Sequence, residues 1–212
     1  MLRDAVEANR LEEVRRLYEA SFPRSEKKPF GFIMKKRKKG FFDVLSIEDG
    51  KGRFCGLVIM MLSGGRVLLD YLAIAPDSQG TGVGSRTLQE LRERYGEERI
   101  VVEIESTLGL GGADETKTAM AGNGCMGGAD NRLRRKAFYL KNGMVPMDYE
   151  VVLFGVEMEV LTFGSELTFE QYHAIYKEVL PRPLAGQIRL QPCRTPGFPG
   201  YGQRVCRDPN DQ

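Results

Sequence analysis

The sequence has few of the residues on which metal, disulfide or membrane proteins depend. Four cysteines are scattered along it without a C-x-x-C pair, and His173 is its single histidine. A structural zinc site is therefore not expected, and reduced thiols in a cytoplasm are the simplest interpretation. No apolar run approaches the ~18 residues of a membrane span, and the first ten residues do not resemble a signal peptide. These absences predict a cytoplasmic protein that binds neither a metal nor a membrane.

Net charge is also scarce. A formal charge of +2 over 212 residues gives no reason to expect nucleic acid as a partner. The content of 42% apolar and 28% charged residues is ordinary for a globular protein. The length suggests one domain, with room for a small appendage.

The stretch from Val67 to Leu91 combines three features that can hold a phosphate. The apolar run Val67–Ala75 is typical of a buried strand. The glycine-rich segment Gln79–Ser85 follows it, and apolar residues recur at helical spacing from about Val83. Glycines let backbone N–H groups turn toward one point, and a helix start adds unpaired donors and a positive dipole end.

A dinucleotide-binding loop is one interpretation of this segment. Gly80 and Gly82 fit the G-x-G-x-x-G pattern, but the third position is Ser85. Glu103 and Glu105 lie roughly where an acidic ribose ligand would fall. The match is partial, and a P-loop is excluded because no Gly-Lys-Ser/Thr follows.

The second interpretation is the pattern Gln/Arg-x-x-Gly-x-Gly directly after a hydrophobic strand, met here by Gln79, Gly82 and Gly84. In this respect the sequence resembles the GNAT superfamily of acetyl-CoA-dependent N-acetyltransferases. The resemblance implies that this loop binds the pyrophosphate of acetyl-CoA. The residues implied are Gln79, Gly80, Thr81, Gly82, Val83, Gly84 and Ser85.

The order of predicted elements agrees with that family. Two helical segments precede three strands joined by short turns, and the glycine loop and its helix then lead to a fourth strand at 99–105. This predicts an α/β fold with a mixed, mostly antiparallel sheet, one parallel βαβ crossover and flanking helices. It argues against the repeated βαβ units of a doubly wound dinucleotide fold.

The expected domain limits follow from composition. Residues 1–163 form the N-acetyltransferase-like domain, and 107–129 form a flexible glycine-rich insertion within it. Residues 164–189 form a helical appendage that packs on the domain edge or on a partner. Residues 190–212, rich in Pro, Gly and polar residues, form a disordered tail.

A second motif strengthens the resemblance. Tyr139, Gly143 and Met144 match the Tyr-x-x-x-Gly-Phe ending of the family's helix after the fifth strand, with Met144 in place of Phe. Many members place an Asn seven residues before the Tyr, facing the cofactor. Arg132 occupies that position here, so the resemblance implies that Arg132 and Tyr139 contact the cofactor.

Acyl transfer from a thioester to an amine needs a proton for the leaving thiolate, a donor for the carbonyl oxygen, and a neutral amine. Tyr139 is the predicted acid. The resemblance implies that the strand segment Leu72, Ala73 and Ile74 pairs with the pantetheine arm and supplies the oxyanion donor. The base is a carboxylate: Glu105 is favoured because it lies nearer the end of its strand, while Glu103, Asp70 and Glu26 remain alternatives.

The predicted function is acetyl transfer from acetyl-CoA to a primary amine by direct attack. The acceptor is a small molecule or a peptide, and the protein is a monomer or a homodimer. Two alternatives are an acyl-CoA-binding sensor or scaffold without catalysis and, less favoured, an NAD(P)-dependent oxidoreductase.

Overall fold

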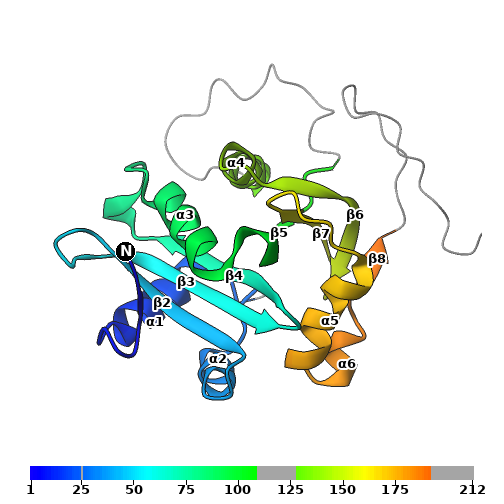
Figure 1. Ribbon diagram of the computed structural model, residues 1–212, viewed down its shortest axis with the longest axis horizontal. Helices are drawn as coiled ribbons and strands as arrows, with labels where there is room; N and C mark the ends of the chain where they lie inside the picture. The colour runs from blue at the N-terminus through cyan, green and yellow to red at the C-terminus, as the bar shows by residue number, and fades with distance from the viewer. Residues whose placement is uncertain (25, 109–127, 192–212) are drawn as a thin grey trace, which may run out of the picture.

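The computed structural model describes residues 1–24, 26–108 and 128–191. Within them the chain forms an eight-stranded sheet with helices on both faces (Figure 1). The strands are β1 (Leu2–Asp4), β2 (Phe42–Glu48), β3 (Phe54–Ser63), β4 (Arg66–Ile74), β5 (Ile100–Glu105), β6 (Val145–Leu153), β7 (Val156–Thr162) and β8 (Arg189–Gln191). The α-helices are α1 (Leu11–Ser21), α2 (Phe30–Arg37), α3 (Val83–Tyr95), α4 (Gly128–Lys141), α5 (Phe169–Val179) and α6 (Arg182–Ala185).

The strands are ordered β1-β2-β3-β4-β5-β7-β6-β8. Every neighbouring pair is antiparallel except β4 and β5, which are parallel because α3 crosses between them. The predicted fold class is therefore confirmed. A sheet with one crossover is not the doubly wound sheet that a dinucleotide fold requires.

The parallel pairing of β4 with β5 is short. It covers only the segments Val67–Leu69 and Ile100–Val102. Beyond them β4 continues to pair with β3, while β5 pairs with β7 on its other side. The two strands therefore separate, and Asp70 and Glu103 are the first residues past the last shared pair.

A β-bulge in β4 lies at the same point. Ile59 pairs with Tyr71 and Met60 pairs with Leu69, so Asp70 is the extra residue. The extra residue reverses which side chains face which side of the sheet. Tyr71 and Ala73 lie in one core, and Val67, Leu69, Leu72 and Ile74 lie in or against the other.

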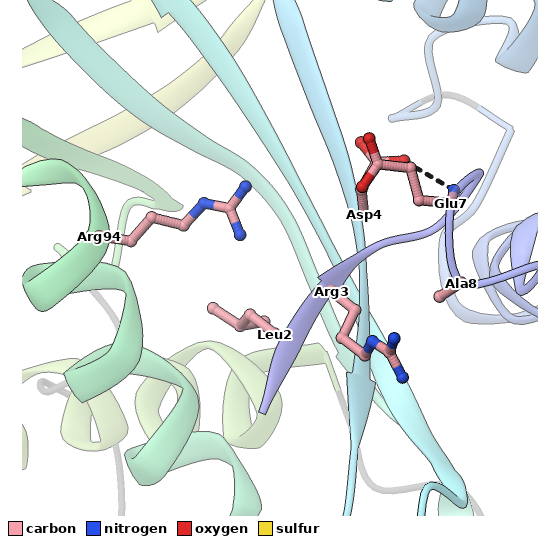
Figure 2. A pocket seen from close by; sticks show the side chains of 6 residues that line it. All are labelled: Leu2, Arg3, Asp4, Glu7, Ala8 and Arg94. Carbon is pink, nitrogen blue, oxygen red and sulfur yellow. Dashed lines mark hydrogen bonds between the residues drawn. The ribbon is translucent and has the colours of Figure 1, made fainter.

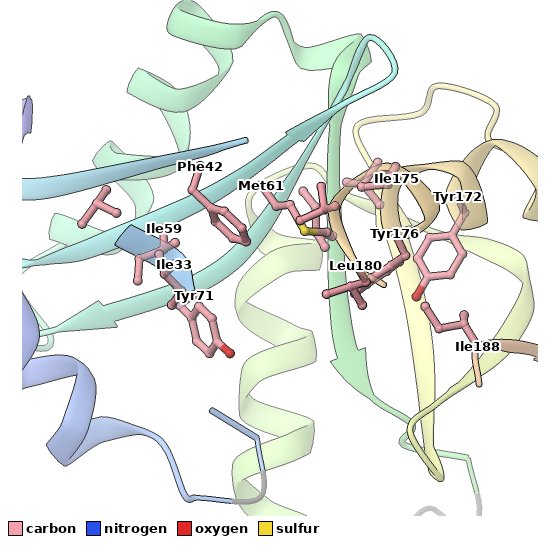
Figure 3. Close-up of a cluster of buried hydrophobic side chains, with 14 of the residues drawn as sticks. Ile33, Phe42, Ile59, Met61, Tyr71, Tyr172, Ile175, Tyr176, Leu180 and Ile188 are labelled. Atoms are coloured by element: carbon pink, nitrogen blue, oxygen red, sulfur yellow. The ribbon is translucent and has the colours of Figure 1, made fainter. Parts of the chain in front are cut away.

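Each face of the sheet has its own hydrophobic core. Helices α3 and α4 cover one face, where Leu88, Leu91 and Tyr139 pack on β5. Helices α1, α2 and α5 cover the other face, where Tyr18, Ile33 and residues of α5 pack together (Figures 1 and 3). The separation of β4 from β5 therefore lies between two differently built layers.

Helix α5 is part of the hydrophobic core on the face of the sheet that α1 and α2 cover, and it does not pack at a domain edge. A capping box begins the helix: the Thr168 hydroxyl accepts from the Gln171 N–H, and the Gln171 side chain accepts from the Thr168 N–H. The apolar stripe of α5 is buried against the sheet and consists of Tyr172, Ile175, Tyr176 and Val179. Segment 164–189 therefore completes the fold of the domain before it.

The predicted insertion and tail lie mostly outside the described residues, at 109–127 and 192–212. At the start of the insertion, Thr107 is buried, and its N–H and hydroxyl both donate to Glu159. At the start of the tail, Leu190 and Gln191 belong to β8, which pairs with β6. No helix in the described parts of the chain is long and apolar enough to cross a membrane.

Candidate active site

The start of helix α3 presents unpaired backbone donors. Gly82 is its N-cap residue, with φ +80°, and no side chain caps the helix. The N–H of Arg86 donates to the carbonyl of Gly82, whereas the N–H groups of the segment Val83–Ser85 precede that first turn. Since glycine offers no capping oxygen, these donors remain available to an anion at the positive end of the helix.

The loop before the helix is tied down by its own side chains. The Gln79 amide donates to the Ile74 carbonyl at 3.1 Å, and the Thr81 hydroxyl donates to the Ser78 carbonyl at 2.7 Å. Gly80 has φ +75°, a conformation that favours glycine. The loop is exposed and ordered by contacts that leave its backbone free, as phosphate binding requires.

The separated part of β4 has a free backbone edge. The Ala75 N–H donates to the Cys55 carbonyl of β3. Antiparallel pairs alternate, so Ala73 also faces β3, whereas Leu72 and Ile74 direct their N–H and C=O groups away from it. Leu72 and Ile74 are therefore the predicted strand donors that the geometry favours, and Ala73 is not.

Tyr139 lies on the α3 and α4 side of the sheet. Gly143, at φ +88°, ends α4 in a Schellman motif in which the Met144 N–H donates to the Tyr139 carbonyl. Tyr139 is 7% exposed. Burial raises the pKa of Tyr139 to about 12, and the Arg135 charge opposes that rise. Tyr139 therefore stays protonated near neutral pH and has a hydroxyl to offer.

Helix α4 holds Tyr139 close to the glycine loop. A Cβ added to Gly84 would lie 3.2 Å from the ring of Phe138, so the two helices pack tightly where α3 begins. This contact explains why the second glycine of the motif is needed even though its φ is ordinary. The two motifs found in the sequence are therefore neighbours in space.

The carboxylates lie on the opposite face of the sheet. Asp70 accepts from the Lys28 ammonium at 2.7 and 2.9 Å, and its side chain is 6% exposed. The backbone of Lys28 is held by Tyr71, whose hydroxyl accepts from the Lys28 N–H at 2.9 Å. Asp70 is therefore neutralised by a cation that the fold fixes in place.

Glu103 has hydroxyl partners instead of a cation. The Tyr176 hydroxyl lies 2.7 Å from both of its carboxylate oxygens. Burial raises the pKa of Glu103 to about 7, while the hydroxyls of Tyr172 and Tyr176 and the Lys28 charge work in the other direction. A carboxylate with this pKa can both accept and release a proton near neutral pH.

Glu105 and Glu26 lie nearer the protein surface. Glu105 forms an ion pair with Arg132 of α4, whose side chain is 42% exposed. Burial, followed by the negative charge of Glu105, raises the pKa of Glu26, and Arg135 and Arg132 oppose the rise. Arg132, predicted to contact the cofactor, is therefore engaged with a carboxylate in this structure.

Sequence analysis missed Lys28, Tyr172 and Tyr176. These residues contact groups that are far away along the chain. For example, 73 residues separate Tyr176 from Glu103. A usable signal was the pair of tyrosines one turn apart on a buried stripe, since a buried hydroxyl needs a polar partner. The identity of that partner could not be deduced from periodicity.

A pocket elsewhere on the surface does not belong to this site. It lies at the C-terminal end of α3 (Figure 2), the opposite end from the glycine loop. It is lined by Leu2, Arg3, Asp4, Glu7, Ala8 and Arg94, whose charges are mixed.

Comparison with known proteins supports the assignment of the fold. No protein-family model and no curated protein sequence matches the chain. Solved structures do, including a protein assigned to the GNAT acetyltransferase family from Bacteroides thetaiotaomicron, with a TM-score of 0.63 and 19% identity over 87% of this chain and 98% of that one. A chimera of spermidine N-acetyltransferase SpeG from Vibrio cholerae and hSSAT gives a TM-score of 0.51 and 15% identity over 76% and 93%. A variant of the Vibrio cholerae spermidine N-acetyltransferase SpeG gives a TM-score of 0.52 and 13% identity over 76% of this chain and 91% of that one. The chain has the fold of the GNAT acetyltransferases.

Proposed function

We propose that this protein transfers an acetyl group from acetyl-CoA to a primary amine by direct attack within a ternary complex. The observation that carries the proposal is the separation of β4 from β5. The glycine-capped start of α3 and Tyr139 lie on one face of the sheet at this point, and carboxylates lie on the other. Such a site can admit two substrates from opposite sides.

The residues present fit coenzyme A. The N–H groups of the segment Val83–Ser85 and the loop from Gln79 to Gly82 would hold the pyrophosphate. The backbone edge at Leu72 and Ile74 pairs with no other strand and would pair with the amide-bearing pantetheine arm, the Gln79 side chain first releasing the Ile74 carbonyl. Acetyl-CoA supplies the activated acetyl group and the thiol leaving group. Arg132 would contact the cofactor only by giving up part of its ion pair with Glu105.

Two groups of the protein would stabilise the reaction on the cofactor side. The N–H of Leu72 is an oxyanion donor for the carbonyl oxygen, since it faces away from β3. The Tyr139 hydroxyl is the hydrogen-bond and proton donor for the departing sulfur. Its pKa of about 12 keeps it protonated but makes it a weak acid, so its contribution belongs at the lower end of the general-acid range.

Glu103 is the carboxylate best suited to take the amine proton. Glu105 was favoured on sequence position, but Arg132 pairs with it, and Lys28 likewise pairs with Asp70. In both pairings a cation already occupies the carboxylate oxygens that would have to meet the amine. Glu103 has only hydroxyls as direct partners and a pKa of about 7, near the optimum for a general base.

The acceptor is a small-molecule or peptide amine. Four carboxylates lie on the acceptor side or at its rim, from Glu26, Asp70, Glu103 and Glu105. Lys28 is paired with Asp70 and Arg132 with Glu105, so Glu26 and Glu103 are the groups that would attract a cationic amine. Two of the similar structures are spermidine N-acetyltransferases by name, which agrees with this class of acceptor.

A panel of amines, including polyamines, amino acids and peptides, tests the proposal. Free thiol released from acetyl-CoA is measured for each amine, and the acetylated amine is identified by mass. Thermal-shift measurements with acetyl-CoA and with NAD accompany the assay. Stabilisation by acetyl-CoA with amine-dependent thiol release is expected. Stabilisation without transfer to any amine would instead support a sensor, and stabilisation by NAD alone would support an oxidoreductase.

A further inference from the structure

Helix α5 reaches the acceptor side through Tyr176. Tyr176 is fully buried beside Ile175 in the core (Figure 3), and its hydroxyl lies 2.7 Å from each carboxylate oxygen of Glu103. The Tyr176 hydroxyl must donate its proton to the bond when Glu103 is ionised, because an ionised carboxylate can only accept. The bond therefore favours the form of Glu103 that can take up a proton.

The position of Tyr176 is fixed by packing. A capping box at Thr168 and Gln171 sets the start of α5, and Ile175 and Val179 beside Tyr176 are buried. A hydroxyl carried by such a helix cannot follow a moving partner, so it holds the carboxylate in one place.

A second hydroxyl on the same helix lies beside the first. The ring centroids of Tyr172 and Tyr176 are 5.7 Å apart. The Tyr172 hydroxyl is buried close to Glu103, and it lowers the pKa of that carboxyl. A hydroxyl can donate to the ionised carboxylate or accept from the protonated one, so Tyr172 can serve Glu103 in either state.

Two charged groups act on Glu103 from other segments, Lys28 before α2 and Asp70 on β4. Tyr71 on β4 and Tyr149 on β6 face it as neutral hydroxyls, because burial and nearby carboxylates, Glu103 among them, raise the pKa of each. Lys28 favours the ionised form, but its ammonium is bonded to Asp70, which disfavours it. Burial and Asp70 therefore raise the proton affinity of Glu103, and the hydroxyls of α5 limit that rise.

We propose that Tyr176 is a positioning residue for this reaction, and that its hydroxyl holds the Glu103 carboxylate in place and ionised so that it can accept the amine proton. The proposal rests on the proposed function for its kinetic consequence. It makes residues 169–179 part of the catalytic unit, although sequence composition separated them from the acetyltransferase-like domain.

The test compares three variants with the wild type. Tyr176→Phe removes the bonded hydroxyl, and the double variant Tyr172→Phe/Tyr176→Phe removes both. Tyr149→Phe is the matched control. The Tyr149 hydroxyl is buried but has no hydrogen-bond partner, so its removal breaks no bond to Glu103. Circular dichroism and thermal unfolding confirm that each variant folds.

The first measurement is the pKa of Glu103 by carboxyl-carbon NMR, with Glu103→Gln identifying its signal. Tyr176→Phe should raise the pKa of Glu103 by about one pH unit, a tenfold change in proton affinity, because the charge-assisted bond from the Tyr176 hydroxyl is lost. The double variant should raise it further, and Tyr149→Phe should leave it within a few tenths. An unchanged Glu103 pKa in folded Tyr176→Phe would overturn the proposal.

The second measurement is the acid limb of kcat/KM against pH. The limb should move upward by about one pH unit in Tyr176→Phe, with the plateau above it retained, a pattern that loss of packing alone would not produce. A Glu103 pKa that moves while the limb stays fixed would overturn the catalytic role of the contact. If no amine is acetylated at all, the proposed function fails, and the NMR titration still decides whether Tyr176 holds Glu103 ionised.

Discussion

Gly82 offers the sharpest test of the cofactor site. It caps α3 at φ +80° and ψ 3°, and a Cβ added there would meet no atom within 4 Å. Gly82→Ala therefore causes no clash. Its cost comes from forcing a side chain into the left-handed region, about 1–2 kcal/mol. For a chain of this length we expect the unfolding temperature to fall by roughly 2–4 °C per kcal/mol.

Gly40 provides a matched control, since it also has φ +80° and open space around its Cβ position. It lies in the turn between α2 and β2, away from the start of α3. Gly40→Ala should lower stability by about the same amount, on the order of 1–2 kcal/mol. The two variants thus separate an effect on folding from an effect on the site.

Only Gly82→Ala should affect the cofactor. Gly82 directly precedes the N–H groups of Val83–Ser85, so relief of the strain at this residue would change the orientation of those groups. We expect acetyl-CoA affinity, measured by calorimetry, to fall at least ~10-fold, or ~1.4 kcal/mol. Unchanged affinity in folded Gly82→Ala would refute phosphate binding at this loop, and an equal loss in Gly40→Ala would show that only general stability was altered.

Two further substitutions test the two faces of the site. Tyr139→Phe removes one hydroxyl and little packing, so turnover should fall by roughly 100-fold while acetyl-CoA affinity holds, as kinetics and calorimetry on one preparation would show. Since the pKa of Tyr139 is about 12, no alkaline limb from this residue is expected below pH ~10, and full turnover would leave Tyr139 as a packing residue. Lys28→Met should destabilise the protein by about 3–5 kcal/mol in urea unfolding, because it leaves the buried Asp70 unpaired. Arg53→Met, which removes one partner of an exposed ion pair, should cost at most ~1 kcal/mol, and equal losses in the two variants would contradict the importance of burial.

The sequence predicted the local geometry of the glycine loop and of the end of α4 better than the contacts around Glu103. The glycine loop and its helix could be recognised because they are local: Gly82 and the residues after it form their geometry within a few positions. Tyr139 and Gly143 likewise belong to one helix end. The relative placement of such motifs followed from the family resemblance.

The acceptor side depends on contacts between distant segments, which periodicity does not specify. Residues 164–189 were predicted to be helical, but nothing in their sequence identifies the surface that α5 covers. Asp70 interrupts an apolar strand, yet nothing in its neighbours announced a bulge that reverses the alternation of β4. Glu105 was favoured over Glu103 because strand position was visible in the sequence, whereas the ion pair with Arg132 and the contact with Tyr176 were not.

The distance along the chain between Glu103 and Tyr176 has a consequence for biosynthesis. The strand that carries Glu103 leaves the ribosome long before α5, and 73 residues must follow before its hydroxyl partner exists. Until α5 packs, one layer of the sheet lacks Tyr172, Ile175 and Tyr176 and leaves apolar surface open to solvent. The nascent chain would thus complete the glycine loop and the end of α4 first and the surroundings of Glu103 last, so a chain arrested before α5 would bear the glycine loop without the hydroxyl that contacts Glu103.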